Sequence, residues 1–434
     1  MLDRRTFVAA AASAGALART RALAASSRAF PPGFLWGAAT AGHQVEGNNV
    51  NADIWLLEHV KPTVFSEPSG DADNSFELWA TDLDLAKSLG LNSYRFSLEW
   101  ARIEPEEGQW SIAMLDHYKR IVDGCRARGM TPVVSFNHYT APRWFSARGN
   151  WLNAQAPASF ARFCEHAASH LGSGIGFATT FNEPNIAPVL NVVLPPPVIE
   201  LQRAMLAAAS RAAGAPRFLA ANACNPEDVP ALTRNLIAGH KAGRQAIKSV
   251  QPDLPVGVTL SMFDDVADGD PTARNAARKR LYGDWLDVVR GDDFLGVQNY
   301  ERVRWGKAGR VPPPASVEHN DAGGEVAADS LANAVRYAHE ATGLPIMVTE
   351  HGVNTHDDAI RARLIPAALV ALRQTMTAGV PVKGYIHWSL LDNWEWVAGF
   401  KGQLGLCSVD RTTFKRTPKP SAGVLRAIAR ANAV

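Results

Sequence analysis

The segment FATTFNEP, residues 177–184, joins a short β-rich run to two polar residues, Asn182 and Glu183. Most of the similar runs along the chain are continuously apolar rather than alternating, which is typical of parallel strands buried on both faces. Ala- and Leu-rich stretches of helical period, such as 235–250 and 360–378, separate them. Eight strands alternating with helices predict an α/β fold, a single (β/α)8 TIM barrel. The predicted strands are residues 34–41, 93–100, 132–139, 177–182, 256–262, 294–300, 345–350 and 383–390.

The composition of the chain excludes some classes of function before any motif is considered. The 434 residues include 44 Lys and Arg against 42 Asp and Glu, and 47% are hydrophobic, which is typical of an ordered globular protein. This balance argues against a nucleic-acid partner, which would require a basic excess. No apolar run approaches the roughly 18 residues that span a bilayer, so we expect no membrane partner for the mature chain. Since no Ser/Gly-rich linker divides the chain, one barrel can account for this length.

The N-terminus has the layout of an export signal. Arg4-Arg5-Thr6-Phe7 is followed by a mildly apolar, Ala-rich stretch and by Ala22-Leu23-Ala24. The pattern predicts a twin-arginine signal peptide over residues 1–24 and a barrel domain over 25–434. Removing the signal takes away four arginines and one aspartate, which changes the net charge from +2 to −1. We therefore expect a periplasmic or secreted protein.

No sequence feature predicts a cofactor or a metal centre. The four cysteines form neither a CxxC motif nor a Cys/His pattern, and we expect mostly buried thiols. Asp264, Asp265, Asp268 and Asp270 lie close together, but their spacing misses the calcium-loop pattern. We interpret them as a solvated loop that caps the next helix at Asp270 or Thr272.

Polar residues lie at or near the C-terminal ends of seven of the eight predicted strands, where a barrel of this type builds its active site. One such residue alone would usually be structural or solvent-exposed. Their convergence on one end of the barrel predicts a functional site there. The residues are Gln44, Arg95, His138, Asn182, Glu183, Tyr300, Glu350 and Trp388.

Two of these residues are carboxylates, Glu183 after the fourth predicted strand and Glu350 at the end of the seventh. Strands four and seven lie on opposite sides of an eight-strand ring, so the two side chains should face each other across its mouth. Glycoside hydrolysis uses such a pair, about 5–5.5 Å apart in retaining enzymes and farther apart in inverting ones. The pair predicts a glycosidase, and its spacing leaves both outcomes open.

Five motifs carry a resemblance to a known family. The chain resembles glycoside hydrolase family 1, the β-glucosidase family, over nearly all of its length after the signal. The order and spacing of the motifs agree with that family throughout. The motifs are residues 34–47, Tyr94-Arg95-Phe96-Ser97 with Trp100, Arg102 and Ile103, Asn182-Glu183-Pro184, Thr349-Glu350-His351-Gly352, and residues 388–396.

The resemblance implies a retaining double displacement, with Glu350 as nucleophile and Glu183 as general acid/base. We expect Arg95 and Tyr300 to hold the pKa of Glu350 down, and apolar surroundings with a nearby negative charge to raise the pKa of Glu183. Asn182 would donate to the sugar 2-hydroxyl. The remaining sugar contacts, with Trp388 as the stacking floor, are predicted for Gln44, His138, Tyr139, Gln298, Trp388, Glu395 and Trp396.

Four positions depart from the family pattern. His351 and Gln298 each stand where the family usually has Asn, and Tyr139 stands where Trp is usual. Leu404 replaces an aromatic residue that normally helps to wall the glycone site. The short segment between Trp285 and Phe294 indicates a more open aglycone side. We expect Trp144, Trp151 and Trp305, on predicted loops, at the aglycone entrance.

The sequence leaves open which sugar is the glycone and whether water or another acceptor receives it from the glycosyl-enzyme. Phospho-glycosidases of the resembled family place Ser, Lys and Tyr where this chain has Glu395, Gly402 and Leu404, so we expect an unphosphorylated glycone. Glucose, galactose, fucose and xylose remain possible glycones. A transglycosidase would use the same intermediate with a sugar or alcohol acceptor. A carbohydrate-binding protein without catalysis would be expected to lack a carboxylate, and both Glu183 and Glu350 are present.

Overall fold

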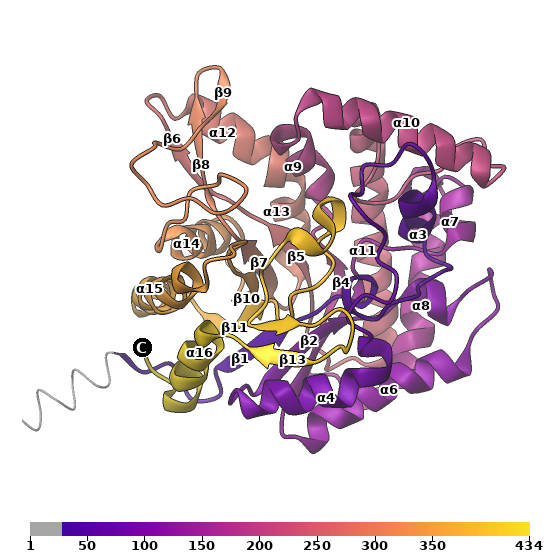
Figure 1. The fold of residues 1–434 in the computed structure, drawn as a ribbon. Helices are drawn as coiled ribbons and strands as arrows, with labels where there is room; N and C mark the ends of the chain where they lie inside the picture. Colours follow the sequence, from indigo (N-terminus) through magenta and orange to yellow (C-terminus); the bar gives the residue numbers. More distant parts are fainter. Residues whose placement is uncertain (1–27) are drawn as a thin grey trace, which may run out of the picture.

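The computed structural model describes residues 28–434, and its centre is a closed barrel of eight parallel strands (Figure 1). The predicted barrel is therefore confirmed, and each predicted strand lies within three residues of the observed one. The predicted signal, residues 1–24, lies outside the described residues. The barrel strands, in the order in which they adjoin, are β1 (Leu35–Ala39), β11 (Val382–Trp388), β10 (Ile346–His351), β7 (Leu295–Asn299), β5 (Val256–Ser261), β4 (Phe177–Asn182), β3 (Thr131–Asn137) and β2 (Ser93–Ser97).

Helices surround the barrel and cover the outer face of its strands (Figure 1). Of the two helical stretches predicted from periodicity, 235–250 lies inside α11, and 360–378 follows α15 to one residue past its end. The helices of the outer ring are α4 (Ser75–Ser88), α6 (Ile112–Ala127), α8 (Ala156–Leu171), α11 (Val229–Val250), α12 (Thr272–Arg278), α13 (Asp284–Val288), α14 (Ser330–Thr342), α15 (Asp358–Thr377) and α16 (Pro420–Ala431).

Shorter helices and strands lie in the connections. The helices among them are α2 (Gly42–Val45), α3 (Asp53–His59), α5 (Trp100–Ile103), α7 (Arg143–Ala147), α9 (Ile186–Val193) and α10 (Pro196–Ala212), of which α10 is long. The additional strands are β6 (Asp264–Ala267), β8 (Arg302–Gly306), β9 (Gly309–Val311), β12 (Cys407–Val409) and β13 (Arg416–Pro418).

Two glycines let α11 lie close against α8 and the short turn that precedes it. A Cβ atom at Gly239 would come 2.7 Å from the ring of Trp151, and one at Gly243 would come 2.7 Å from the ring of Phe160. Both distances are too short for real carbon contacts, so only a residue without a side chain allows this approach. The aromatic rings therefore fill the space between helix and barrel.

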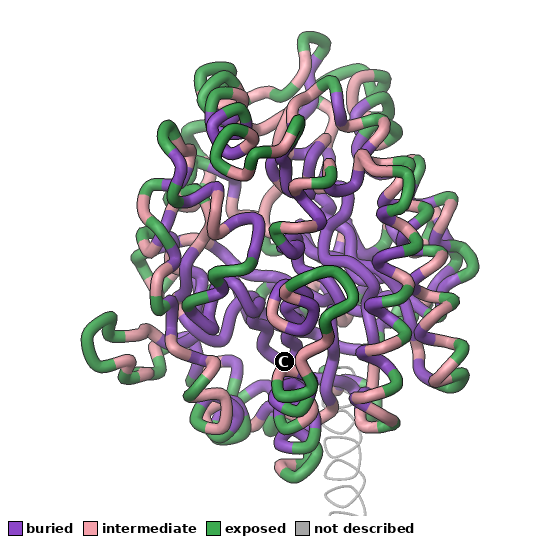
Figure 2. The backbone as a smooth tube through the Cα atoms, turned by 90° about the vertical axis from the view of Figure 1, so that its right-hand side faces the viewer, coloured by how far each residue is buried: buried purple, intermediate pink, exposed green. Residues whose placement is uncertain are grey.

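Successive side chains of the barrel strands belong alternately to two hydrophobic clusters. Leu35, Val133 and Met347 pack together in one buried cluster, whereas their neighbours in the chain, such as Trp36 and Val348, belong to the other. Successive side chains of a strand point to opposite faces, so the first cluster fills the barrel and the second lies under the helices. The centre of the molecule is buried throughout (Figure 2). The barrel is therefore a packed support for residues at its mouth.

The acidic segment after β5 differs from its prediction. It forms β6, which joins β8 and β9 in a separate three-stranded sheet. Asp264 pairs with Arg302 at 2.7 Å, and Asp265 accepts a hydrogen bond from the Trp305 ring nitrogen at 2.6 Å. Both aspartates are buried, so the interpretation as a solvated loop is wrong for them. Asp270 accepts hydrogen bonds from Thr272 at the start of α12, as predicted.

The four cysteines are buried and unpaired, as expected from the sequence. Among the helices of residues 28–434, none combines the length and the apolar character needed to cross a membrane.

Candidate active site

A cavity of about 390 Å³ lies at the C-terminal ends of the barrel strands. It brings together all the predicted site residues except Arg95 and Gln298. Both of these hydrogen-bond to Asn182, and Gln298 lines a neighbouring cavity. The predicted residues that line the cavity are Gln44, His138, Tyr139, Asn182, Glu183, Tyr300, Glu350, Trp388, Glu395 and Trp396.

Glu350, at the end of β10, is held by two donors. The Arg95 guanidinium donates from Nη1 to Oε1 at 2.5 Å, and the Tyr300 hydroxyl donates to Oε2 at 2.5 Å. Burial raises the pKa of Glu350, while Arg95 and Tyr300 act to lower it. The two partners act in the predicted direction. The expected net lowering of the pKa is nevertheless wrong, because burial outweighs them.

Glu183 follows β4 in a left-handed backbone conformation, with φ of 41°. Its amide donates to the carbonyl of Thr259 on β5 at 3.0 Å, which fixes the backbone. Its carboxyl group accepts a hydrogen bond from the Tyr139 hydroxyl. Burial, followed by the charge of Glu350, raises the pKa of Glu183 to about 8, against the opposing effect of Tyr139. The raised pKa agrees with the prediction.

The two carboxyl groups differ in the charge of their partners. Glu350 contacts a guanidinium, whereas the side-chain partners of Glu183 are neutral hydroxyls, those of Tyr139 and Ser261. Burial keeps the Tyr139 pKa well above its usual value, so this hydroxyl stays protonated and remains a donor. When the pair holds a single proton, the proton therefore resides on Glu183 and the negative charge on Glu350.

A chain of hydrogen bonds fixes the orientation of His138. The Asn182 carbonyl oxygen accepts from Arg95 at 2.6 Å and from Gln298 at 2.7 Å, so the amide nitrogen must face His138. That nitrogen lies 3.2 Å from His138 Nε2. Burial holds the His138 pKa well below its usual value, so the ring is neutral and carries its proton on Nδ1. Among the described residues His138 Nδ1 has no partner, and it can donate to a ligand.

The opposite rim of the cavity is formed by the segment after β11. The Gln44 amide nitrogen donates to Asn393 at 2.9 Å and to the Trp394 carbonyl at 3.0 Å. The Gln44 carbonyl oxygen has no partner within residues 28–434. The Trp388 ring nitrogen donates to Glu395 at 3.1 Å, and burial raises the pKa of Glu395 to about 8. These groups form a polar pocket that suits the hydroxyls of a sugar.

Three residues of the cavity wall have a left-handed backbone: Tyr139 with φ of 68°, Glu183 with φ of 41° and Trp396 with φ of 51°. Such conformations are costly for residues with a side chain, and they cluster at functional sites. The motifs locate these residues but contain no signal of this backbone geometry. Asn393, which orients Gln44, was also missed, although it lies inside the 388–396 motif.

The predicted aglycone-entrance tryptophans lie elsewhere. Trp151 is buried against Phe181. Trp305 donates to Asp265, and Trp144 donates to the carbonyl of Glu104. None of the three lines the cavity, so this expectation is wrong.

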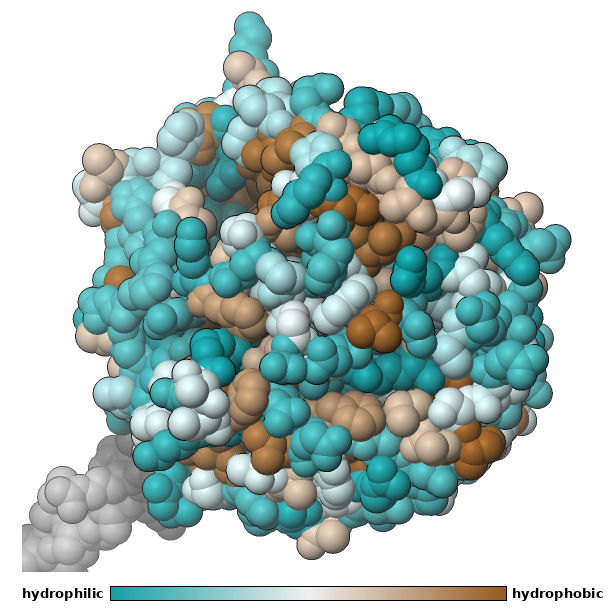
Figure 3. All heavy atoms as spheres, turned by 45° about the vertical axis from the view of Figure 1, so that its right-hand side comes forward, coloured by the Kyte–Doolittle hydropathy of each residue, from teal (hydrophilic) through white to brown (hydrophobic). Residues whose placement is uncertain are grey.

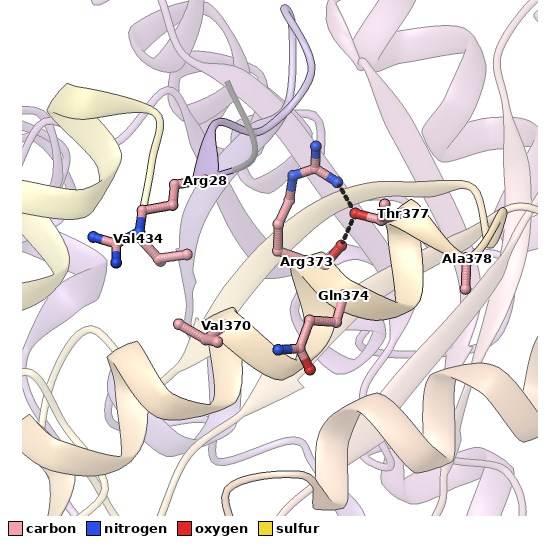
Figure 4. A pocket seen from close by; sticks show the side chains of 7 residues that line it. All are labelled: Arg28, Val370, Arg373, Gln374, Thr377, Ala378 and Val434. Carbon is pink, nitrogen blue, oxygen red and sulfur yellow. Dashed lines mark hydrogen bonds between the residues drawn. The ribbon is translucent and has the colours of Figure 1, made fainter. Parts of the chain in front are cut away.

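A second cavity, of about 760 Å³, lies beside the C-terminus between Arg28, α15 and Val434 (Figure 4). Figure 4 shows the hydrogen bond that Arg373 donates to Thr377 across one turn of α15. The distance from Arg373 Nη1 to Thr377 Oγ1 is 2.7 Å. Arg373 also donates to the carbonyl of Ala29 at 2.6 Å. The lining side chains include no carboxylate or imidazole, so we place the chemistry in the smaller cavity.

Comparisons with known proteins agree with this geometry. The model of the family described as Glycosyl hydrolase family 1 matches residues 26–218 and 311–434. A β-glucosidase of Agrobacterium sp. is 29% identical, over 92% of this chain and 95% of that protein. The thermostable β-glucosidase B of Thermobispora bispora is also 29% identical, over 94% and 92%. The solved structure of a β-glucosidase named 1317 is 41% identical, with a TM-score of 0.89, covering 93% of this chain and 99% of that one. The β-glycosidase BGL167 is 43% identical, with a TM-score of 0.87 and coverage of 93% and 98%.

Proposed function

The chain belongs to glycosyl hydrolase family 1 and is a β-glycosidase, and we propose that it hydrolyses unphosphorylated, glucoside-like β-glycosides with Glu350 as nucleophile and Glu183 as acid/base. The observation that carries this assignment is the unequal surroundings of the two carboxyl groups. A guanidinium favours the ionised form of Glu350, and burial favours the protonated form of Glu183. This is the protonation state from which a double displacement starts.

In the first step a carboxylate oxygen of Glu350 attacks the anomeric carbon while the bond from that carbon to the aglycone oxygen breaks. The proton of Glu183 passes to the leaving oxygen, so the aglycone departs as a neutral alcohol. The product is a glycosyl ester on Glu350. Attack consumes the charge of Glu350, which removes the second cause of the raised pKa of Glu183. Glu183 is then ready to act as a base.

In the second step Glu183 takes a proton from water while the water oxygen attacks the anomeric carbon. The bond to Glu350 breaks, and the free sugar leaves with the configuration of the substrate. Asn182 is fixed by Arg95 and Gln298, and its amide lies where it can contact the sugar 2-hydroxyl. His138 Nδ1 and the Gln44 carbonyl oxygen provide further contacts for sugar hydroxyls.

The polar pocket supports an unphosphorylated glycone. Glu395 lies in the cavity wall, and Leu404 lines the same cavity. At Gly402 a Cβ atom would come 2.8 Å from Glu395, so no longer side chain fits there without displacement. These three positions provide no cation for a phosphate group. We expect a higher kcat/KM for a β-glucoside than for its 6-phosphate, and a higher value for the 6-phosphate would reject this part of the proposal.

A panel of aryl β-glycosides tests the function directly. The glucoside, galactoside, fucoside, xyloside and mannoside are compared for wild type and Glu350→Gly. We expect cleavage of at least one by wild type and none by the variant, with azide restoring activity and giving the inverted glycosyl azide. Folded wild-type protein that cleaves none of them would overturn the proposal. If azide rescued Glu183→Gly and gave the inverted product, Glu183 would be the nucleophile and Glu350 the acid/base.

We also propose that the protein is exported to the periplasm or beyond. The proposal rests on Arg4-Arg5 and on the small residues up to Ala24. Cell fractionation of the full chain tests it, with Arg4→Lys/Arg5→Lys as the matched variant. Activity that stays with the cytoplasm for both proteins would reject export.

A further inference from the structure

The catalytic cavity continues beyond the two carboxyl groups along an aliphatic wall. Val64 and Phe65, from the segment before α4, lie on this wall with Ile186, Leu190 and Leu194 from α9 and the residue after it. The side chains of α9 that reach the cavity are only half-buried. Hydrophobic residues also gather around a hollow in the upper part of the face in Figure 3, at the height at which Figure 1 places α9 and α10.

A neighbouring cavity of about 370 Å³ adjoins the catalytic cavity. The two cavities share Ile186, Leu190, Tyr300, Glu301 and Ala322 as lining residues. Their common wall therefore runs from the nucleophile side, at Tyr300, to α9.

The chain connectivity determines which part of a substrate meets this wall. Helix α9 begins at Ile186, three residues after Glu183, and the Ile186 amide donates to the Glu183 carbonyl at 2.9 Å. Glu183 delivers its proton to the leaving oxygen, so the first atoms of the aglycone must lie beside the start of α9. The polar half of the cavity, around Gln44 and Glu395, is left for the glycone.

We propose that the aglycone is an apolar alcohol, with an alkyl, aryl or fused-ring skeleton, which packs against the aliphatic wall of α9. The inference rests on the proposed function. A second sugar would place hydroxyls against Ile186 and Leu190, which cannot satisfy them. An apolar skeleton would instead remove both its own surface and the half-exposed α9 side chains from water.

Three polar side chains of the cavity each use one atom for a hydrogen bond within the protein. The Gln202 amide donates to the Cys224 carbonyl at 2.6 Å, and the Asn354 oxygen accepts from the Gln403 amide at 2.9 Å. The Asn320 oxygen accepts from the Gly324 amide at 2.8 Å.

Two further polar groups line the cavity. The Asn222 oxygen has no partner among the described residues, and Glu301 has Arg310 at 3.7 Å. Together with the second polar atoms of the Gln202, Asn320 and Asn354 amides, they suit polar substituents at the edge of an otherwise apolar aglycone.

A series of alkyl β-glucosides from methyl to octyl, kept below micelle-forming concentrations, tests the proposal. Alcohols of this series differ little in acidity, so their leaving-group chemistry is nearly constant and kcat/KM reports binding of the chain. We expect kcat/KM to rise about fourfold for each methylene that the wall buries. Octyl glucoside should also exceed cellobiose. A flat series, or cellobiose above octyl glucoside, would overturn the proposal.

A matched pair of leucines assigns the effect to the wall. Leu190→Asn places an amide in the wall, whereas Leu201→Asn makes the same change at an exposed position of α10 outside both cavities. We expect Leu190→Asn to lower the octyl-to-methyl ratio of kcat/KM about tenfold, because the loss of apolar contact falls on the longer chain. Leu201→Asn should keep the wild-type ratio. An unchanged ratio in Leu190→Asn would reject the α9 wall, whereas failure of wild type on every β-glycoside would reject the proposed function itself.

Discussion

Glu350 and Glu183 are chemically identical side chains at the ends of two barrel strands, and both are buried. The groups around them differ. Glu350 receives hydrogen bonds from Arg95 and Tyr300, whereas Glu183 is bonded to the neutral hydroxyls of Tyr139 and Ser261. Burial raises the pKa of both, but the cation beside Glu350 keeps the negative charge on that side. The comparison teaches that their different roles arise from neighbouring donors rather than from depth in the protein.

The largest expected effect separates the two carboxyl groups by their dependence on the leaving group. Glu350→Gln removes the nucleophile, so kcat/KM should fall about 10⁴-fold or more for every aryl glycoside. Glu183→Gln removes only the acid and later base. The rate of the first step should therefore decrease little for a dinitrophenyl glycoside, because its leaving group needs no proton. For an alkyl glycoside the rate should decrease strongly.

The measurement is a plot of log(kcat/KM) against leaving-group pKa for wild type and both variants. The Glu183→Gln line should be steeper than the wild-type line, and the Glu350→Gln values should be low throughout. A steep line for Glu350→Gln with a shallow one for Glu183→Gln would mean that the roles are reversed. Circular dichroism of each variant controls for folding.

A smaller loss of kcat/KM is expected when Arg95, the cation that distinguishes the surroundings of Glu350 from those of Glu183, is removed. Arg95→Met leaves Glu350 buried with Tyr300 alone, so its carboxylate is less favoured and Asn182 loses a partner. We expect kcat/KM to fall about 10²–10³-fold, in the range found when one preorganised electrostatic donor is deleted. The acid limb of the pH profile should also move to higher pH.

The matched control is Arg416→Met, which breaks another buried ion pair, with Asp82 at 2.7 Å, away from the cavity. Both variants should lower the melting temperature, because each leaves a buried carboxylate without its cation. Only Arg95→Met should change the pH profile of the folded enzyme. Equal activity losses in the two variants would show that the arginine acts through stability alone.

The sequence predicts the barrel and the members of its site for a physical reason. Parallel strands buried on both faces appear as apolar runs, and the residue after each run lies at the same end of the barrel. Glu183, Glu350 and their neighbours were therefore located correctly. The hydrogen bond from Tyr139 to Glu183 was not predicted, because it depends on left-handed backbone geometry at both residues.

The errors share one cause, which is that long-range packing leaves no local pattern. Asp264 was expected in water, but its partner Arg302 lies 38 residues later in the chain. Trp151 was expected at the entrance, but Phe181 on β4 buries it. For Glu350 the partners were identified, whereas the depth of burial, which decides the net direction of its pKa, depends on the complete fold.

The smallest expected effect distinguishes the two tyrosines by the limb of the pH profile that each controls. kcat/KM should fall at low pH as Glu350 takes up a proton, and at high pH as Glu183, with a pKa of about 8, loses one. Each tyrosine lowers the pKa of the carboxyl group to which it donates. Tyr139→Phe should therefore move the alkaline limb up by about one pH unit, and Tyr300→Phe should move the acid limb up by a similar amount. The pH dependence of kcat/KM on one aryl glycoside measures both shifts.

Because the carboxyl groups interact, a small shift of the other limb is expected in each variant. Movement of the same limb in both variants would contradict the separate environments of Glu183 and Glu350.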